Sequence, residues 1–125
     1  LAMDIVQEEE YLHRDVVKIV HDLKGDVLYT SRSPIPHADI FSPKIGAKRI
    51  YGIFAFRWHR LKTFTNLSES PLEIQESCDS NRFFDNGFKQ RIAPYHYVAS
   101  FAVDNPNDIN KVEGSMQADL YWGKY

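Results

Sequence analysis

The chain has 125 residues and a formal net charge of −2, and 43% of its residues are hydrophobic. This length allows one domain with a single hydrophobic core. The near-neutral charge gives no reason to expect a nucleic acid or an anionic membrane as a partner. A single cysteine excludes an intrachain disulfide and a Cys-rich zinc site. Because no apolar run has the length of a transmembrane helix and no signal peptide opens the sequence, we expect a cytoplasmic protein.

The first residues suggest a natural start inside the sequence. Leu1-Ala2 precede Met3, so we interpret Met3 as the initiator and Leu1-Ala2 as a remnant of cloning. Residues 3–12 are predicted to form an arm or a short helix around three consecutive glutamates. Residues 1–125 are expected to form one domain.

A β-hairpin is predicted next. Residues 16–20 and 27–30 are rich in β-branched residues, and Lys24-Gly25 between them is a turn signal. Residues 32–48 hold three prolines and show little periodicity. They are predicted to form a long loop, and loops of this length are usually functional or mobile.

The most apolar run of the chain covers residues 50–56. It is short, aromatic and β-branched, which predicts a strand buried on both faces. Residues 58–64 are predicted to form a short helix that turns the chain.

The sequence Ser70-Pro71-Leu72-Glu73 predicts the start of a second helix. Ser70 is expected as the N-cap, with proline at the first helical position and Glu73 closing a capping box. The helix is predicted to run from Pro71 to about Phe84, before the stop signal of residues 85–87. Its apolar stripe is thin, which indicates either a ligand pocket or a dimer mate, and we favour a dimer interface.

The rest of the chain is predicted to add two strands and a last helix. The strands are expected at residues 89–92 and 97–103, and the helix at residues 106–120, with Asp104 or Asn105 as its N-cap. The expected fold class is therefore α/β, a mixed sheet with flanking helices. Cys78 is expected to be a buried, unreactive thiol.

Five segments in this order resemble the CMP-Kdo synthetases (3-deoxy-manno-octulosonate cytidylyltransferases). The segments are Val16 to Val20, Leu28 to Pro36, Arg49 to Arg57 (family pattern R-H-x-G-I-Y-x-Y-R), Ser70 to Glu73 (S-P-L-E) and Val103 to Asp108 (V-D-T-P-E-D). The resemblance implies the C-terminal half of a nucleotidyltransferase with a Rossmann-like fold. That family transfers CMP from CTP to a sugar acid with the help of magnesium. Its nucleotide-binding half, with a Gly- and Arg-rich loop, has no counterpart here.

The resemblance carries roles onto single positions. Asp104 matches the metal-binding aspartate, so it would hold Mg²⁺ only where a complete enzyme supplies the rest of the site, and the chain alone is expected to have no cofactor. Arg32 matches an arginine near the sugar-acid pocket, where a guanidinium suits a carboxylate. Phe54 stands in place of a tyrosine, and Asp79-Ser80 stand in place of a Glu-Gln pair that contacts the sugar.

Plainer roles remain open for the same residues. Asp104 can serve as a helix N-cap, and Arg32 can pair with a surface acid. Ile50 replaces a pocket histidine, and together with Phe54 this removes polar contacts with a polyol.

Two hypotheses follow. The first is a truncated, non-catalytic module that forms a homodimer and binds a partner, with a sugar acid as a possible ligand. The second is the sugar-acid-binding and dimerisation half of a working cytidylyltransferase whose nucleotide-binding half is supplied elsewhere. A purely structural α/β protein is a third reading, because a shared fold does not establish function.

Overall fold

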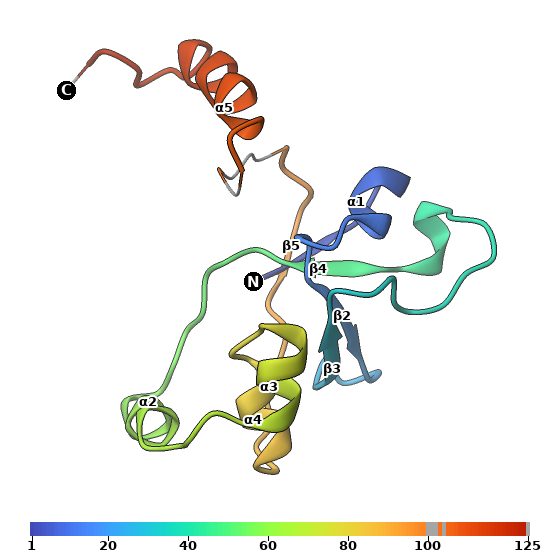
Figure 1. The fold of residues 1–125 in the computed structure, drawn as a ribbon, viewed down its shortest axis with the longest axis vertical. Coiled ribbons are helices and arrows are strands. Elements are labelled where there is room, and N and C mark those ends of the chain that lie inside the picture. The colour runs from blue at the N-terminus through green and yellow to red at the C-terminus, as the bar shows by residue number, and fades with distance from the viewer. Residues whose placement is uncertain (100–102, 104, 125) are drawn as a thin grey trace.

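The computed structural model describes all residues except 100–102, 104 and 125. The elements in chain order are β1 (Ala2–Asp4), α1 (Glu8–Leu12), β2 (Lys18–His21), β3 (Val27–Ser31), the 3-10 turn η1 (Pro43–Ile45), β4 (Lys48–Ile50), α2 (Trp58–Thr65), α3 (Pro71–Glu76), α4 (Asn81–Asp85), β5 (Pro94–Tyr95) and α5 (Asp108–Gln117). The strands form one sheet in the order β3-β2-β4-β1-β5 (Figure 1). All neighbours are antiparallel except β1 and β5, so the mixed α/β architecture is confirmed.

The predicted hairpin is confirmed. β2 and β3 pair with Ile19 opposite Thr30, and the register shifts between Val20 and His21. Gly25 lies in the turn with φ +82°, a conformation that favours glycine. This hairpin is the part of the sheet on which the candidate site is built.

The chain starts with a strand, β1, which the sequence did not predict, and the predicted helix follows it. The predicted helix is present as α1, but Ala2 and Met3 are buried in β1 between β4 and β5. The Ala2 amide donates to the Ala93 carbonyl oxygen at 3.0 Å. Because their backbone completes the sheet, Leu1-Ala2 take part in the fold, whatever the origin of these two residues.

A small core lies where the long loop covers α1. Ile5, Tyr11 and Ala47 are buried there, with Phe41 packed against Tyr11 at 5.2 Å between ring centroids. The Tyr11 hydroxyl donates to the Pro36 carbonyl oxygen at 2.6 Å. The segment predicted as a long loop is thus a loop with one 3-10 turn, held against the sheet.

The prediction of a strand at residues 50–56 is wrong. β4 ends at Ile50, and residues 52–56 are exposed and lie outside the sheet; Ile53 is 57% exposed. Figure 1 shows this segment leaving the sheet and running to α2. The reason is that β4 pairs only with the short strands β1 and β2, and no described strand continues beside it.

The single helix predicted over residues 71–84 is also wrong. The capping box at Ser70 and Glu73 is confirmed, but α3 ends at Glu76 because Ser77 adopts a left-handed conformation with φ +47°. The chain then starts α4, which ends before Gly87 as the stop signal predicted. Cys78 lies between these helices and is buried, as expected.

The expected strands after α4 are mostly absent. Within residues 89–92, Arg91 only forms an isolated bridge with Asp26, and the short β5 lies at Pro94–Tyr95 instead. Residues 97–99 and Val103 are not in a strand, and the rest of the predicted strand lies outside the described residues. The chain has few alternating positions here that bury a side chain, which weakens pairing.

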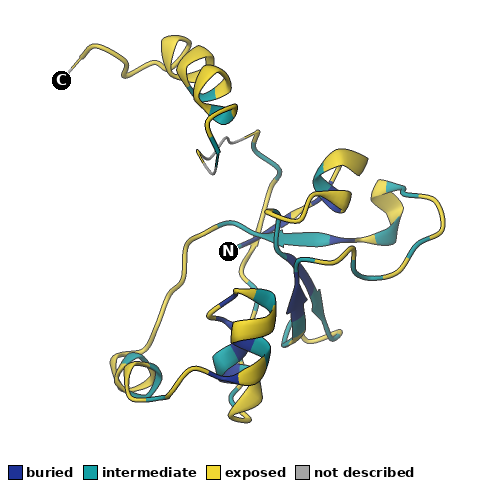
Figure 2. Cartoon of the chain, in the orientation of Figure 1, coloured by how far each residue is buried: buried dark blue, intermediate teal, exposed yellow. Residues whose placement is uncertain are grey.

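The helices predicted at residues 58–64 and 106–120 are confirmed as α2 and the shorter α5. The Asn105 amide donates to the Asp108 carboxylate at 3.1 Å, so the helix start is held by this pair; Asp104, the other expected cap, lies outside the described residues. α5 projects from the sheet and is largely exposed (Figures 1 and 2). In the described part of the chain, every helix is too short or too polar to cross a bilayer.

Candidate functional site

A pocket of about 610 Å³ opens between the sheet and α3. Its lining residues come from the start of β2, the end of β4, the segment before α2, and α3 with the turn that follows: Val17, Ile50, Phe54, Glu69, Glu73, Ile74, Ser77, Cys78 and Asp79. One side is therefore apolar and the other carries carboxylates. Such a combination suits a ligand that has both a carbon skeleton and hydroxyl groups.

Three positions that the sequence resemblance assigned to a sugar-acid pocket meet in this cavity. Ile50, Phe54 and Asp79 all line it, although 29 residues separate the first from the last. The left-handed turn at Ser77 makes this possible, because it reverses the chain after α3 and places the next residues at the pocket. A continuous helix would carry Asp79 onward along its own axis.

Ser80 and Arg32 are not among the described residues that line this pocket. Ser80 is buried next to Asp79, and its hydroxyl oxygen has no hydrogen-bond partner among the described residues. Asp104, the expected metal ligand, lies outside the described residues. In the described part of the chain, no three His, Cys, Asp or Glu side chains are grouped to hold a metal ion.

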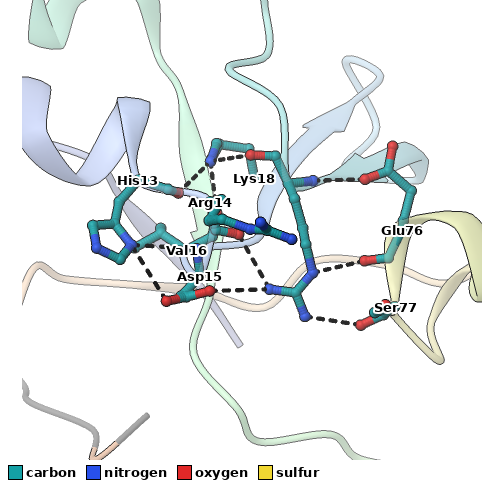
Figure 3. Close-up of polar contacts among 8 residues, drawn as sticks. His13, Arg14, Asp15, Val16, Lys18, Glu76 and Ser77 are labelled. Carbon is teal, nitrogen blue, oxygen red and sulfur yellow. Dashed lines mark hydrogen bonds and ion pairs between the residues drawn. The ribbon is translucent and has the colours of Figure 1, made fainter. Parts of the chain in front are cut away.

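Arg32 binds the end of α3. Its Nε donates to the Glu76 carbonyl oxygen at 2.7 Å, and Nη2 donates to that of Ser77 at 2.9 Å. Nη1 donates to the Arg14 carbonyl oxygen at 3.1 Å and lies 3.9 Å from the Asp15 carboxylate (Figure 3). All three nitrogens of the guanidinium thus have protein partners, and Arg32 shapes the pocket by fixing its α3 wall.

The electrostatics of the pocket are acidic. Glu73 is paired with Arg82, and the hydrogen bonds from Arg82 lower the pKa of this carboxyl. Glu69 and Asp79 are exposed carboxylates on the same wall. Because no Lys, Arg or His is among the described lining residues, the pocket offers acceptors for hydroxyl groups but no counter-charge for a carboxylate.

A second cavity of about 680 Å³ lies on the other side of Val17 and Ile50, which line both. Arg49 and Glu10 form an ion pair there at 2.8 Å, and Glu10 Oε2 and Arg49 Nε are buried with no hydrogen-bond partner in the described part of the chain. Lys111 of α5 also lines it. We did not expect these residues from the sequence, although Arg49 opens the apolar run and Glu10 ends the glutamate run.

The sequence and the fold can be compared with those of known proteins. No protein-family model matches the chain. The 3-deoxy-manno-octulosonate cytidylyltransferase of Syntrophotalea carbinolica is 34% identical over 125 aligned positions, which cover 94% of this chain and 50% of the relative. That of Dichelobacter nodosus is 36% identical over 100 positions, which cover 79% of this chain and 41% of the relative.

A solved structure agrees with these relatives. A CMP:2-keto-3-deoxy-manno-octonic acid synthetase, solved in complex with CTP, superposes with a TM-score of 0.74 at 30% identity and covers 95% of this chain. The chain corresponds to the C-terminal half of a CMP-Kdo synthetase family protein. It spans about half the length of the relatives it matches, 50% of the first and 48% of the solved chain. The resemblance inferred from five short segments is thereby confirmed over nearly the whole chain.

Proposed function

We propose that this chain is the sugar-side half of a cytidylyltransferase fold, a binding and association module that does not transfer CMP by itself. The observation that carries the proposal is the convergence of Ile50, Phe54 and Asp79 on one pocket. The described residues include no Gly-rich loop that could bind a triphosphate, so a nucleotide would have to be held by other sequence.

The pocket supports weak binding of a sugar acid. The Phe54 ring offers an apolar surface for the sugar skeleton, and the carboxylates of Glu69 and Asp79 can accept hydrogen bonds from its hydroxyls. The carboxylate of the sugar acid has no cation to pair with in the pocket, since Arg82 is paired with Glu73 and Arg32 binds carbonyl oxygens. We therefore expect millimolar affinity for Kdo in the isolated chain.

Self-association through α3 is the second part of the proposal. Ile74 on this helix is 63% exposed, which leaves an apolar side chain beside the pocket. A homodimer would cover it and would narrow the pocket mouth. Sedimentation equilibrium tests this part: the proposal expects a dimer that Ile74→Asp converts to a monomer, and a monomer at all concentrations contradicts it.

The second candidate is a half of a working enzyme whose nucleotide-binding half lies on other sequence. The match to full-length cytidylyltransferases favours it. In that case Asp104 would take part in holding Mg²⁺, which would neutralise charge on the phosphates of the nucleotide. Replacing Asp104 with Asn in the completed enzyme would then abolish turnover, and unchanged turnover would exclude this role.

An NMR titration of the labelled chain with Kdo, CTP and Mg²⁺, added separately and together, tests the binding function. The proposal expects shifts at Phe54 and Asp79 with millimolar Kdo, and no CMP transfer by the chain alone. Asp79→Asn should weaken the response, whereas Asp39→Asn, an exposed carboxylate in the long loop, should leave it unchanged. No shift at these residues with millimolar Kdo would contradict sugar-acid binding.

A further inference from the structure

The pocket between the sheet and α3 carries more negative charge than the cation beside it can balance. Glu69, Glu73 and Asp79 line it, and no Lys, Arg or His is among its described lining residues. Hydrogen bonds with Glu73 raise the pKa of Arg82, burial opposes this, and the charges of Glu69 and Asp79 raise the pKa further. Three carboxylates therefore lie around one guanidinium.

That guanidinium is committed to one of the three. Arg82 Nε donates to Glu73 Oε2 at 2.7 Å, and Nη2 donates to Glu73 Oε1. The carboxylates of Glu69 and Asp79 are exposed, and neither has a hydrogen bond or an ion pair with any described residue. Two acceptor groups with negative charge are thus left for a ligand, and a cationic donor suits them best.

The Phe54 ring, from the segment before α2, is a further unused group of this pocket. It is 37% exposed, and no ring contact or cation contact within the described part of the chain includes it. Phe56 differs, since its ring lies 6.0 Å from that of Phe64 and 5.8 Å from that of Phe83. The face of a free aromatic ring offers apolar surface and attracts a cation.

We propose that the pocket selects an amino sugar, a pyranose ring that carries a protonated amino group. The ammonium group binds the carboxylates of Glu69 and Asp79, and the sugar ring covers Phe54. A cavity of about 610 Å³ is within the size range of small-molecule sites. This inference rests on the proposed function for the premise that the pocket binds a sugar, and it adds the sign of the charge that the sugar carries.

A sugar acid suits the same cavity less well. Its carboxylate would lie near Glu69 and Asp79, and like charges repel at short range. Val17, Ile50 and Phe54 on the apolar side offer no side-chain donor that could offset this repulsion. Ligands with one ring and different charges should therefore differ in affinity through the charge.

A matched ligand series tests the proposal. Glucosamine, glucose and glucuronate are titrated into the labelled full chain, and dissociation constants are taken from the NMR shifts at Phe54 and Asp79. We expect glucosamine to bind about tenfold more tightly than glucuronate, with glucose between them. Added salt should narrow the difference because it screens the charges. Ethylamine, which has the charge without the ring, should bind more weakly than glucosamine.

Variants separate the charge from the ring. Asp79→Asn keeps the shape of the side chain, and it should weaken glucosamine binding about threefold while glucose binding is retained. Phe54→Leu should weaken both sugars, because the aromatic face is lost. Asp39→Asn, in the long loop, should change neither. Unchanged β2–β3 amide signals show that each variant folds.

The outcomes distinguish this inference from the proposed function. Glucuronate binding as tightly as glucosamine overturns the inference and leaves sugar-acid binding intact. Ethylamine binding as tightly as glucosamine also overturns it, because the site would then attract any small cation. Preferred glucosamine binding without a response to Kdo supports the inference and contradicts sugar-acid binding. No shift at the pocket with any of the sugars overturns both.

Discussion

The Glu73 carboxylate and the Arg82 guanidinium form two hydrogen bonds that join α3 to α4 across the left-handed turn. Both side chains are mostly buried, 10% and 17% exposed. Arg82 also lies over the Phe64 ring at 4.7 Å and donates to the Leu67 carbonyl oxygen. One pair therefore fixes the relative position of two short helices and of the chain that leads to them, and it sets the shape of the pocket wall.

We predict that Glu73→Gln lowers the midpoint of thermal unfolding by about 5–10 °C, since Arg82 would keep its burial but lose its counter-charge. Glu73 has a lowered pKa in the folded chain, so its stabilisation is complete above its unfolded pKa and is lost as the pH falls through the folded value. Wild type and variant should converge in acid. Calorimetry against pH measures this. Glu69→Gln is the matched control, and an equal effect of both substitutions would contradict the assignment.

Lys18 is enclosed by main-chain oxygens. Its Nζ donates to the carbonyl oxygens of His13 at 2.7 Å, Val16 at 2.7 Å and Arg32 at 2.6 Å (Figure 3). These oxygens belong to the chain before β2 and the chain after β3. The ammonium group thus ties together both ends of the hairpin on which the pocket rests.

We predict that stability rises with pH between about 8 and 10.5 because of Lys18. Burial lowers the pKa of Lys18 from 10.5 to about 8; the charge of Arg32 lowers it further, while Glu76 and Asp15 act in the opposite direction. In this pH window the unfolded chain still holds the proton and the folded chain does not, so raising the pH favours folding. NMR titration of Nζ and urea unfolding at several pH values test it, and Lys18→Met should remove this contribution. A Lys18 that titrates near 10.5 contradicts it.

Local signals were sufficient for some of the fold. The β2–β3 hairpin, the start of α3 at Ser70 and the stop at Gly87 depend on neighbouring residues alone, and each was predicted. The conformation of the run after Ile50 was predicted wrongly, because its composition favours a strand but no described strand pairs with it beyond Ile50. The end of α3 at Ser77 could not be predicted either, since serine has no preference for a positive φ.

The site was predictable only through resemblance. Phe54 and Asp79 were assigned by their place in family motifs, and the structure places both at one pocket. Val17 and Glu69 were missed because they reach the pocket by tertiary packing and belong to no motif that marks them. Arg32 was given a ligand role by its match to a family arginine, with pairing to a surface acid as the alternative, but its hydrogen-bond partners are set by how α3 ends.

Ser77 offers a stabilising substitution. Its φ of +47° is strained for a residue with a Cβ atom, and its side chain is exposed. Ser77→Gly should stabilise the chain by about 0.5–1 kcal/mol in urea unfolding, while the backbone carbonyl that binds Arg32 is retained. The comparison is Ser68→Gly, another exposed serine, at which no stabilisation is expected. Loss of stability with Ser77→Gly would show that the turn is not strained.

Tyr29 provides a direct probe of the contact between β3 and α3. Its hydroxyl donates to Glu76 Oε1 at 2.5 Å, and this hydrogen bond, followed by burial, raises the pKa of Tyr29 above 10.0. For Glu76, burial acts to raise the pKa, but hydrogen bonds from Tyr29, the Arg32 amide and Ser31 outweigh it and leave the pKa lowered. One carboxylate therefore holds a strand and a loop against the end of α3.

We predict that Glu76→Gln brings the pKa of Tyr29 back toward 10.0, as followed by NMR of the phenol ring. The raised pKa means that this contact stabilises the fold fully below the unfolded value and that the stabilisation is lost as the pH rises through the folded one. The variant should therefore be less stable than wild type at neutral pH and should lose less stability in alkali. Glu113→Gln, on exposed α5, should change neither quantity. An unchanged Tyr29 titration in Glu76→Gln would mean that the hydroxyl does not bind this carboxylate in solution, and the α3 wall of the pocket would then depend on Arg32 alone.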